Sequence, residues 1–355
     1  MHQRRSIRVL CTLGPASLRP EVITGLEQRG VDIFRINLSH TALSAVEDTI
    51  RLVRQHASVP ICLDTEGAQV RCGIMAPDVA LRVGQAVRLT PEKVVGTEEL
   101  ISLRPASAFA TLRAGSTLSI DFDGALLRVG LVDDRGATAI VTGAGAVHSN
   151  RAVAIDPAPA LPPLTAKDRR ALEIGAELGV DHVALSFAAS GDDVALVRSL
   201  LPAGATVIAK IESRAGVARV EEIINAADAV LIDRGDLSRE VPLESVPFYQ
   251  KAIVRQANRF NTPVYVATNL LETMVEHRRA TVAEANDIAN TLLDGVHGLV
   301  LAAETAIGID PLGVVDAVAR SIAAFERSTA ALLQADEITP PLPGPAGEPV
   351  GSAVR

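Results

Sequence analysis

The chain has 355 residues, of which 48% are hydrophobic and 21% are charged, and its formal net charge is −8. This composition is typical of a globular protein with one large domain and a smaller module, or with two ordinary domains. The acidic balance argues against nucleic acid as the main partner, because phosphate backbones are bound by concentrated Lys and Arg, and no basic cluster is present.

The amino-terminal segment and the cysteines exclude two further classes of protein. The first residues, MHQRRSIRVLCTLG, are basic but lack the apolar core of a signal peptide, and no stretch reaches transmembrane length. Cys11, Cys62 and Cys72 have no metal-ligand spacing, and an odd number of cysteines gives no disulfide framework. We therefore predict a cytoplasmic protein with no membrane partner, in which Cys11 and Cys62 are small buried apolar residues.

Strand-like runs alternate with amphipathic helical segments through most of the chain, which is typical of a parallel α/β sheet or barrel. Strands are predicted at residues 7–12, 31–37, 59–64, 181–186, 206–212, 229–233, 263–268 and 298–303. Helices are predicted at 20–29, 44–56, 167–178, 192–201, 217–226, 246–258, 282–293 and 311–328. Eight such units fit an α/β protein with a (β/α)8 TIM barrel.

One interval interrupts this alternation after the third strand. Residues 71–163 show no strong helical pattern, but they contain short β-rich runs at 87–89, 117–121, 126–131 and 138–141, separated by turn residues. We predict an inserted all-β lid domain at 71–163, ending in a Pro-rich hinge, AIDPAPALPPLTAKD, whose Thr165 caps the next helix. The barrel then comprises 1–70 and 164–335, followed by a disordered Pro-rich tail at 336–355.

Charged residues follow two of the predicted barrel strands. Lys210 and Glu212 end the run that begins at residue 206, and Asp236 follows the run that ends at residue 233. Strand carboxyl ends meet at one rim of a barrel, where active sites lie. Two neighbouring carboxylates suit a hard divalent cation, Mg²⁺ or Mn²⁺, and a lysine beside them suits a bound anion. The simpler interpretation is that these residues form ordinary ion pairs at the rim.

A series of motifs in this order resembles the pyruvate kinase family. The motifs span roughly residues 7–330 and read FRINLSH, LDTEGAQVR, IAKIESRAGV, RGDLS, VATNLLETM, ATVAEANDIANTLLDG and ETAIGIDPLG. The resemblance implies a barrel with a β-rich lid after its third strand, in agreement with the pattern above. It also implies phosphoryl transfer between phosphoenolpyruvate and a nucleoside diphosphate, with small-molecule substrates and a homo-oligomeric assembly.

The resemblance implies roles for individual residues. Glu212 and Asp236 would bind Mg²⁺ (or Mn²⁺), and Lys210 would stabilise the phosphoryl group during transfer. Arg35 and Arg71 match the arginines that hold phosphate, and Thr268 matches the threonine near the substrate carboxylate and the proton path. The family's ligands for a monovalent cation, K⁺, match Asn37, Ser39, Asp64 and Thr65.

Two further sites remain open at this stage. Backbone amides of Gly235 and Asp236, which open a helix, could bind the substrate carboxylate. His40 would lie near the nucleotide in the family pattern, whereas a lone histidine beside a strand end is commonly a capping or surface residue.

The chain departs from the family pattern at several positions. Asp233 replaces an alanine, and its carboxylate would repel phosphoenolpyruvate unless it points away, pairs with Arg234 or recruits another cation. A lysine and a glutamate of the third motif become Glu66 and Gln69, which bears on nucleotide contacts and K⁺ dependence. The sequence SFAAS at 186–190 lacks two cations of the family, and Ala302 lacks a hydroxyl. The family's α/β regulatory domain after the barrel is not expected, because a Pro-rich tail follows instead.

These features leave three functions open. The first is Mg²⁺-dependent phosphoryl transfer of the pyruvate kinase type, giving pyruvate and a nucleoside triphosphate. The second keeps Mg²⁺-enolate chemistry but makes or breaks a carbon–carbon bond in another pyruvate-like acid, since a metal-bound enolate needs the same electrostatic support. The third is a non-catalytic homologue that binds metal or ligand without turnover.

Overall fold

A closed barrel of eight parallel strands forms the centre of the protein. The computed structural model describes residues 7–67, 69–121, 124–159 and 161–334, so the predicted tail at 336–355 lies outside the described residues. The strands close in the order β1-β17-β16-β15-β14-β13-β3-β2, and each pairs in parallel with its neighbours. They are β1 (Arg8–Leu13), β2 (Ile33–Asn37), β3 (Ile61–Asp64), β13 (His182–Leu185), β14 (Thr206–Ile211), β15 (Ala229–Asp233), β16 (Val264–Ala267) and β17 (Gly298–Leu301). The predicted barrel is confirmed.

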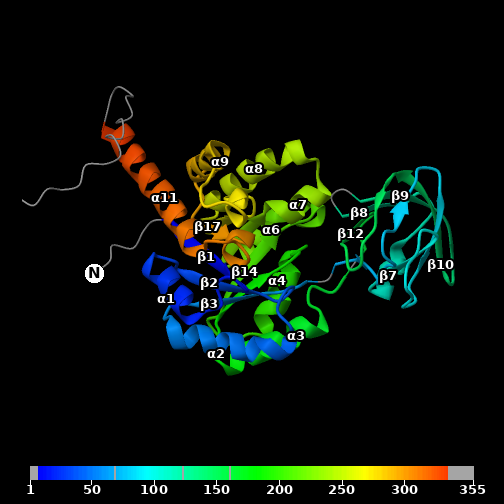
Figure 1. Cartoon of the computed structure of the whole chain (residues 1–355), viewed down its shortest axis with the longest axis horizontal. Coiled ribbons are helices and arrows are strands. Elements are labelled where there is room, and N and C mark those ends of the chain that lie inside the picture. The colour runs from blue at the N-terminus through cyan, green and yellow to red at the C-terminus, as the bar shows by residue number, and fades with distance from the viewer. Residues whose placement is uncertain (1–6, 68, 122–123, 160, 335–355) are drawn as a thin grey trace, which may run out of the picture.

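Helices surround the barrel and pack against its outer face (Figure 1). They are α1 (Pro20–Gln28), α2 (Val46–His56), α3 (Ala166–Glu177), α4 (Gly191–Ser199), α5 (Arg214–Ala218), α6 (Val220–Ala226), α7 (Arg234–Glu240), α8 (Val246–Arg259), α9 (Val282–Leu293), α10 (Ala303–Ala306) and α11 (Pro311–Gln334). Four short 3₁₀ helices also occur, η1 (Leu43–Ala45), η2 (Ala106–Thr111), η3 (Leu243–Ser245) and η4 (Glu272–Val275). No helix within the described residues has the length and apolar character needed to cross a bilayer.

The strands from β4 to β12, between β3 and α3, form a separate β structure, which we call the insert. It holds a seven-stranded sheet in the order β12-β8-β9-β10-β6-β7-β4 and a two-stranded sheet of β11 and β5. The strands are β4 (Arg71–Cys72), β5 (Ala80–Leu81), β6 (Ala86–Thr90), β7 (Leu100–Arg104), β8 (Thr117–Ile120), β9 (Leu126–Asp133), β10 (Gly136–Gly143), β11 (Gly145–Ala146) and β12 (Val153–Asp156). Figure 1 shows the insert beside the barrel, at the end of the molecule opposite α11.

Burial differs between the two kinds of strand. Every residue of β15 is buried, as expected for a parallel strand covered on both faces. In β10 the pattern alternates over much of the strand, with Val141 buried and Ile140 42% exposed. The insert has its own apolar cluster, centred on residues such as Leu89, Ile101 and Leu127.

The structure sharpens the sequence predictions at the junction that returns to the barrel. The first residues of the predicted hinge are ordered as strand β12, which pairs with β8. The hinge is therefore shorter than predicted. Thr165 caps α3 as predicted, and it does so through a capping box in which Thr165 and Asp168 each accept a hydrogen bond from the other residue's backbone N–H. Cys11 and Cys62 are buried free thiols, as expected.

Candidate active site

A layer of polar side chains closes the interior of the barrel at the carboxyl ends of its strands. Below it lies an apolar interior that includes Leu10, Ile33, Cys62, Ala184, Ile208 and Leu231. Because side chains alternate across a strand, the residue two positions later on each strand faces the same interior. Those residues are Thr12, Arg35, Asp64, Ser186, Lys210 and Asp233, and each is buried. We call this set the polar layer.

The ammonium group of Lys210 lies at the centre of the polar layer. Its Nζ is 2.7 Å from Oε1 of Glu212, 3.4 Å from Oδ1 of Asp64 and 3.5 Å from Oδ2 of Asp233. Nζ also donates a hydrogen bond to Oγ of Ser186 over 3.2 Å. Burial alone would lower the pKa of Lys210, but the three carboxylates outweigh it and raise that pKa. Lys210 is therefore a permanent cation at neutral pH.

Arg35 provides a second buried cation on the opposite side of Asp64. Its guanidinium donates to Oδ2 of Asp64 over 3.0 Å and to the Thr12 hydroxyl over 2.7 Å. The Arg35 and Asp64 side chains are 5% and 1% exposed. A buried pair that is bonded on both sides holds its geometry firmly, so Arg35 is fixed beside Lys210 through the carboxylate that they share.

Three carboxylates converge beside Lys210. Ligand oxygens of Glu212, Asp233 and Asp236 all lie within 4.8 Å of one another. Burial is the largest influence on Glu212 and raises its pKa, opposed by Lys210 and reinforced by Asp236 and Asp233. Burial and the Asp233 charge likewise raise the pKa of Asp236. Carboxylates at this separation repel one another unless a cation lies among them, so the donor set fits a hard divalent metal ion.

Thr268 is held in a strained backbone conformation at the end of β16. Its φ angle is 67°, in the left-handed region that a β-branched residue rarely adopts. The surrounding structure fixes it, because the Arg234 guanidinium donates to its carbonyl over 2.6 Å and the Gly235 N–H donates to its hydroxyl oxygen over 2.9 Å. The hydroxyl in turn donates to Oδ1 of Asp233 over 3.0 Å. Thr268 is thereby aimed at the carboxylates.

The first amides of α7 are used within the chain. The Gly235 N–H donates to Thr268, and the Asp236 N–H donates to Oδ1 of Asp233 over 3.5 Å. Asp233 thus takes the position of the anion that these amides were predicted to bind. The prediction that Gly235 and Asp236 hold a substrate carboxylate therefore requires Thr268 and Asp233 to release them.

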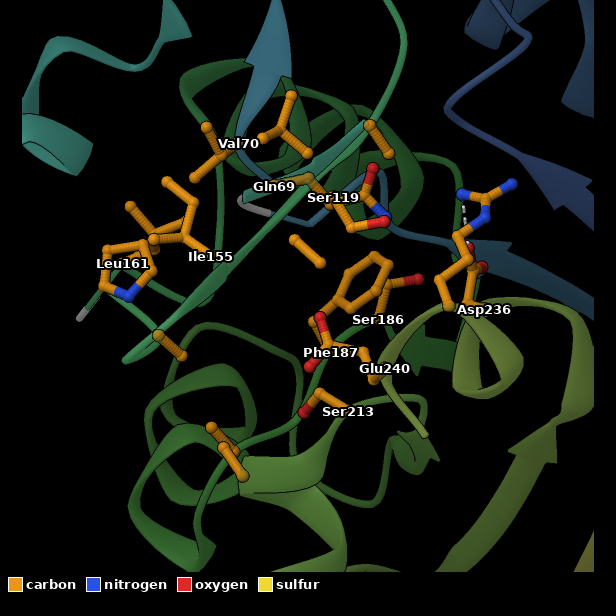
Figure 2. A pocket seen from close by; sticks show the side chains of 18 of the residues that line it. Gln69, Val70, Ser119, Ile155, Leu161, Ser186, Phe187, Ser213, Asp236 and Glu240 are labelled. Carbon is orange, nitrogen blue, oxygen red and sulfur yellow. Dashed lines mark ion pairs between the residues drawn. The ribbon is translucent and has the colours of Figure 1, made fainter. Parts of the chain in front are cut away.

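A cavity of about 150 Å³ opens between the barrel and the insert and reaches the polar layer. Figure 2 shows Val70, Ser119 and Ile155, from the insert and its approach, facing Phe187 and Asp236 of the barrel. The ring of Phe187 projects between the two groups. The Phe187 N–H donates to Oε2 of Glu212 over 2.6 Å, which couples this wall to the carboxylates. A ligand in the cavity could contact both the charged residues and the insert.

The structure brings together Arg35, Asp64, Lys210, Glu212, Asp236 and Thr268, all predicted from the sequence. Arg71 begins the insert, where it bonds to the Asn150 carbonyl over 3.0 Å. Burial lowers the pKa of Arg71, and the charges of Glu66 and Asp236 oppose that shift, so Arg71 lies within electrostatic range of the site. His40 is exposed on the loop after β2.

The predicted K⁺ ligands lie together at the ends of β2 and β3. Asn37 and Asp64 are paired in register between the two strands. Their oxygens already have protein partners: Oδ1 of Asn37 accepts from the Ser39 N–H over 2.9 Å, and Oγ1 of Thr65 accepts from the Ser186 N–H over 2.9 Å. Their assignment to K⁺ stays a prediction.

Sequence reasoning did not assign roles to Thr12 and Ser186, and it left the orientation of Asp233 open. Thr12 orients Arg35, Ser186 lies between Asp64 and Lys210, and Asp233 faces Lys210. The alternation of interior residues along each strand could have found all three. Each follows an interior apolar residue by two positions.

Comparison with known proteins gives one consistent result. A family model described as the barrel domain of pyruvate kinase matches residues 4–315. A pyruvate kinase from Corynebacterium efficiens is 36% identical over 90% of this chain and 69% of its own length. One from Mycobacterium tuberculosis is 34% identical over 91% of this chain and 71% of its own length. A crystal structure of a pyruvate kinase from Cryptosporidium parvum superposes with a TM-score of 0.84 at 28% identity, covering 95% of this chain and 74% of that one.

Proposed function

The chain belongs to the pyruvate kinase family and is a phosphotransferase, and from this premise we propose that it transfers a phosphoryl group from phosphoenolpyruvate to a nucleoside diphosphate. The products are pyruvate and a nucleoside triphosphate. The phosphoryl group leaves the enol oxygen for a terminal phosphate oxygen of the nucleotide, and the resulting enolate takes a proton at its methylene carbon. One observation carries the proposal: Lys210 and Arg35 are two fixed, buried cations joined by Asp64, beside a carboxylate cluster that fits a divalent metal ion.

Lys210 and Arg35 are suited to hold and neutralise the phosphoryl group. Phosphoryl transfer depends mainly on positioning and on charge stabilisation, and preorganised charges act strongly where water is excluded. Lys210 remains protonated, so it acts as a cation and not as a base. Arg71, at the entrance from the insert, would add charge on the outer side of the transferred group, with His40 near the nucleotide.

Glu212 and Asp236 would hold the divalent cation, Mg²⁺ or Mn²⁺. Such an ion neutralises charge on phosphate and enolate oxygens when it is bound. We assign K⁺ to the oxygens of Asn37, Ser39, Asp64 and Thr65, which lie at the ends of β2 and β3. Thr268 would orient the enolate end of the substrate and lie on its proton path, because its hydroxyl is fixed among Asp233 and the start of α7.

A second candidate is enolate chemistry on another pyruvate-like acid. It is favoured by the wall of the cavity beside Phe187, where Ala189 stands at a position that carries a cation in the family motif. Fewer cations on this side weaken attraction for a nucleotide, whereas the metal-binding side retains Lys210 and Glu212.

Phosphorus NMR of the purified protein with phosphoenolpyruvate, Mg²⁺ and K⁺, with and without ADP, tests the proposal. We expect phosphoenolpyruvate to disappear only when ADP is present, with new triphosphate signals. Omitting K⁺ tests the monovalent site, where we expect slower conversion. If phosphoenolpyruvate stays intact under all conditions, phosphoryl transfer from it is excluded, and other pyruvate-like acids should be tested with an electrophilic carbon partner.

A further inference from the structure

Asp233 places an additional negative charge inside the polar layer. It ends β15, is 5% exposed, and follows the interior residue Leu231 by two positions. Its carboxylate lies 3.5 Å from the Lys210 ammonium and accepts hydrogen bonds from the Thr268 hydroxyl and the Asp236 N–H. The side chain therefore points into the site.

Arg234, the adjacent cation in the sequence, does not neutralise Asp233. Its guanidinium pairs with Asp287 over 2.8 Å and donates twice to the Thr268 carbonyl. Arg234 is thus directed away from the barrel interior toward α9. Solvent does not neutralise Asp233 either, since the residue is buried.

The buried charges of the site do not balance. Lys210 and Arg35 are two cations, whereas Asp64, Glu212 and Asp233 are three carboxyl groups, so one negative charge is in excess when all five groups are ionised. Asp236 does not change this sum, because it pairs with Arg239 over 2.9 Å. An uncompensated buried charge is costly, and a bound cation would remove the excess.

We propose that Asp233 is a third carboxylate ligand of the divalent cation, together with Glu212 and Asp236. The inference rests on the metal site of the proposed function and extends it. It is supported by the ligand oxygens of the three side chains, which lie within 4.8 Å of one another, and by the excess buried charge. Oxygen donors of this kind select a hard cation such as Mg²⁺ or Mn²⁺.

Asp233 as a metal ligand would also affect substrate binding. A third carboxylate strengthens the hold on the cation before substrate arrives, and it leaves less net positive charge for an anionic ligand. Asp233 also occupies the amide of Asp236, which a substrate carboxylate would otherwise use. Asp233 therefore favours binding of the metal ion before the substrate, and it disfavours binding of a substrate carboxylate at the start of α7.

A titration of the substrate-free protein with Mn²⁺ tests the proposal without turnover. Electron paramagnetic resonance measures the free ion at each step. We expect Asp233→Ala to lower the affinity at least about tenfold, as loss of a metal-supporting group commonly does. Asp233→Asn should lower it as well while the melting temperature stays near that of the parent, because the amide oxygen can still accept from Asp236 N–H. Asp287→Asn is the matched control, because it removes a carboxylate bonded to Arg234 outside the cluster and should leave Mn²⁺ affinity unchanged.

The outcomes separate this inference from the function on which it rests. Unchanged Mn²⁺ affinity in both Asp233 variants, with loss of binding in Glu212→Gln, overturns the third ligand but preserves the metal site. Unchanged affinity in all three variants overturns the whole metal site, including this inference. Conversion of phosphoenolpyruvate is measured separately, so a failed substrate assay with weakened Mn²⁺ binding in the Asp233 variants would contradict only the assigned reaction.

Discussion

The barrel and the insert differ in the polar residues that they bury. Within the described residues, every buried ionisable carboxylate or cation belongs to the barrel or the segments around it, whereas the buried polar residues of the insert carry no charge. The buried charged residues are Arg35, Asp64, Asp168, Lys210, Glu212, Asp233, Glu284 and Glu304, and the buried polar residues of the insert are Thr90, Ser102 and Ser116.

This difference separates residues kept for chemistry from residues kept for stability. Burying a charge is unfavourable unless it is paired. The five buried charges at the barrel mouth, those of Arg35, Asp64, Lys210, Glu212 and Asp233, therefore cost folding free energy that an apolar layer would not. The insert instead has a core of Leu, Ile and Val, which serves to stabilise its sheet. Substitutions should therefore affect activity in one region and folding in the other.

The largest expected effect comes from removing the central cation of the barrel. Lys210→Ala should lower the rate of phosphoryl transfer by about 1000-fold or more, because it deletes a preorganised charge at the reacting group. Steady-state conversion of phosphoenolpyruvate and ADP measures the loss. Lys251→Ala is the matched control, since Lys251 pairs with Asp294 on the outer helices and should leave the rate unchanged. Retention of the rate in Lys210→Ala would show that Lys210 is not the phosphoryl-binding cation.

A core substitution in the insert should act on stability. Leu89 is fully buried in β6, so Leu89→Ala should lower the free energy of unfolding of the insert by roughly 3 kcal/mol through lost burial and a cavity. Leu131→Ala is the control, because Leu131 is 77% exposed in β9 and its removal should cost less than about 0.5 kcal/mol. Denaturant unfolding compares the two, and equal losses would contradict a separate apolar core.

Glu284 is a buried carboxylate that lies away from the barrel mouth, and we expect it to contribute to stability. Glu284 accepts hydrogen bonds from Thr273 and Thr281 and completes the capping box of α9. Burial would raise the pKa of Glu284, but these bonds outweigh it and lower that pKa. Glu284→Gln should therefore reduce the free energy of unfolding at pH 7 by about 1 kcal/mol, without changing the reaction rate.

The stabilisation by the Glu284 carboxylate should decrease as the pH falls. A carboxyl whose pKa is lower in the folded state stabilises the fold above its unfolded pKa, and this contribution disappears as the pH falls through the folded value. The difference between the parent and Glu284→Gln should therefore be constant near neutrality and shrink below the ordinary glutamate value of 4.5. Glu173→Gln, an exposed control in α3 paired with Arg170, should change stability by less than about 0.5 kcal/mol at pH 7. A difference that grows on acidification would refute the role given to Glu284.

The barrel and the position of the insert could be predicted from the sequence. All eight barrel strands were predictable, because strands covered on both faces appear as continuous apolar runs such as 229–232. In the insert β6, β8, β9 and β10 were found, whereas β7 (Leu100–Arg104) was missed and β12 was assigned to the hinge. The strands β4, β5 and β11 have only two residues each and give no periodic signal. The rule that barrel active sites lie at the strand ends also singled out Lys210, Glu212 and Asp236 as candidate site residues, and the structure brings them together.

The pairing of the site residues could not be predicted from the sequence. The sequence left open whether Asp233 points away, pairs with Arg234 or faces a cation, and the structure shows Arg234 bonded to Asp287 and Asp233 facing Lys210. It also shows that Thr268 and Asp233 take the amides of α7. Local sequence fixes which face a side chain lies on, but its partner depends on distances between strands and helices far apart along the chain, and these distances are set by barrel closure and helix packing.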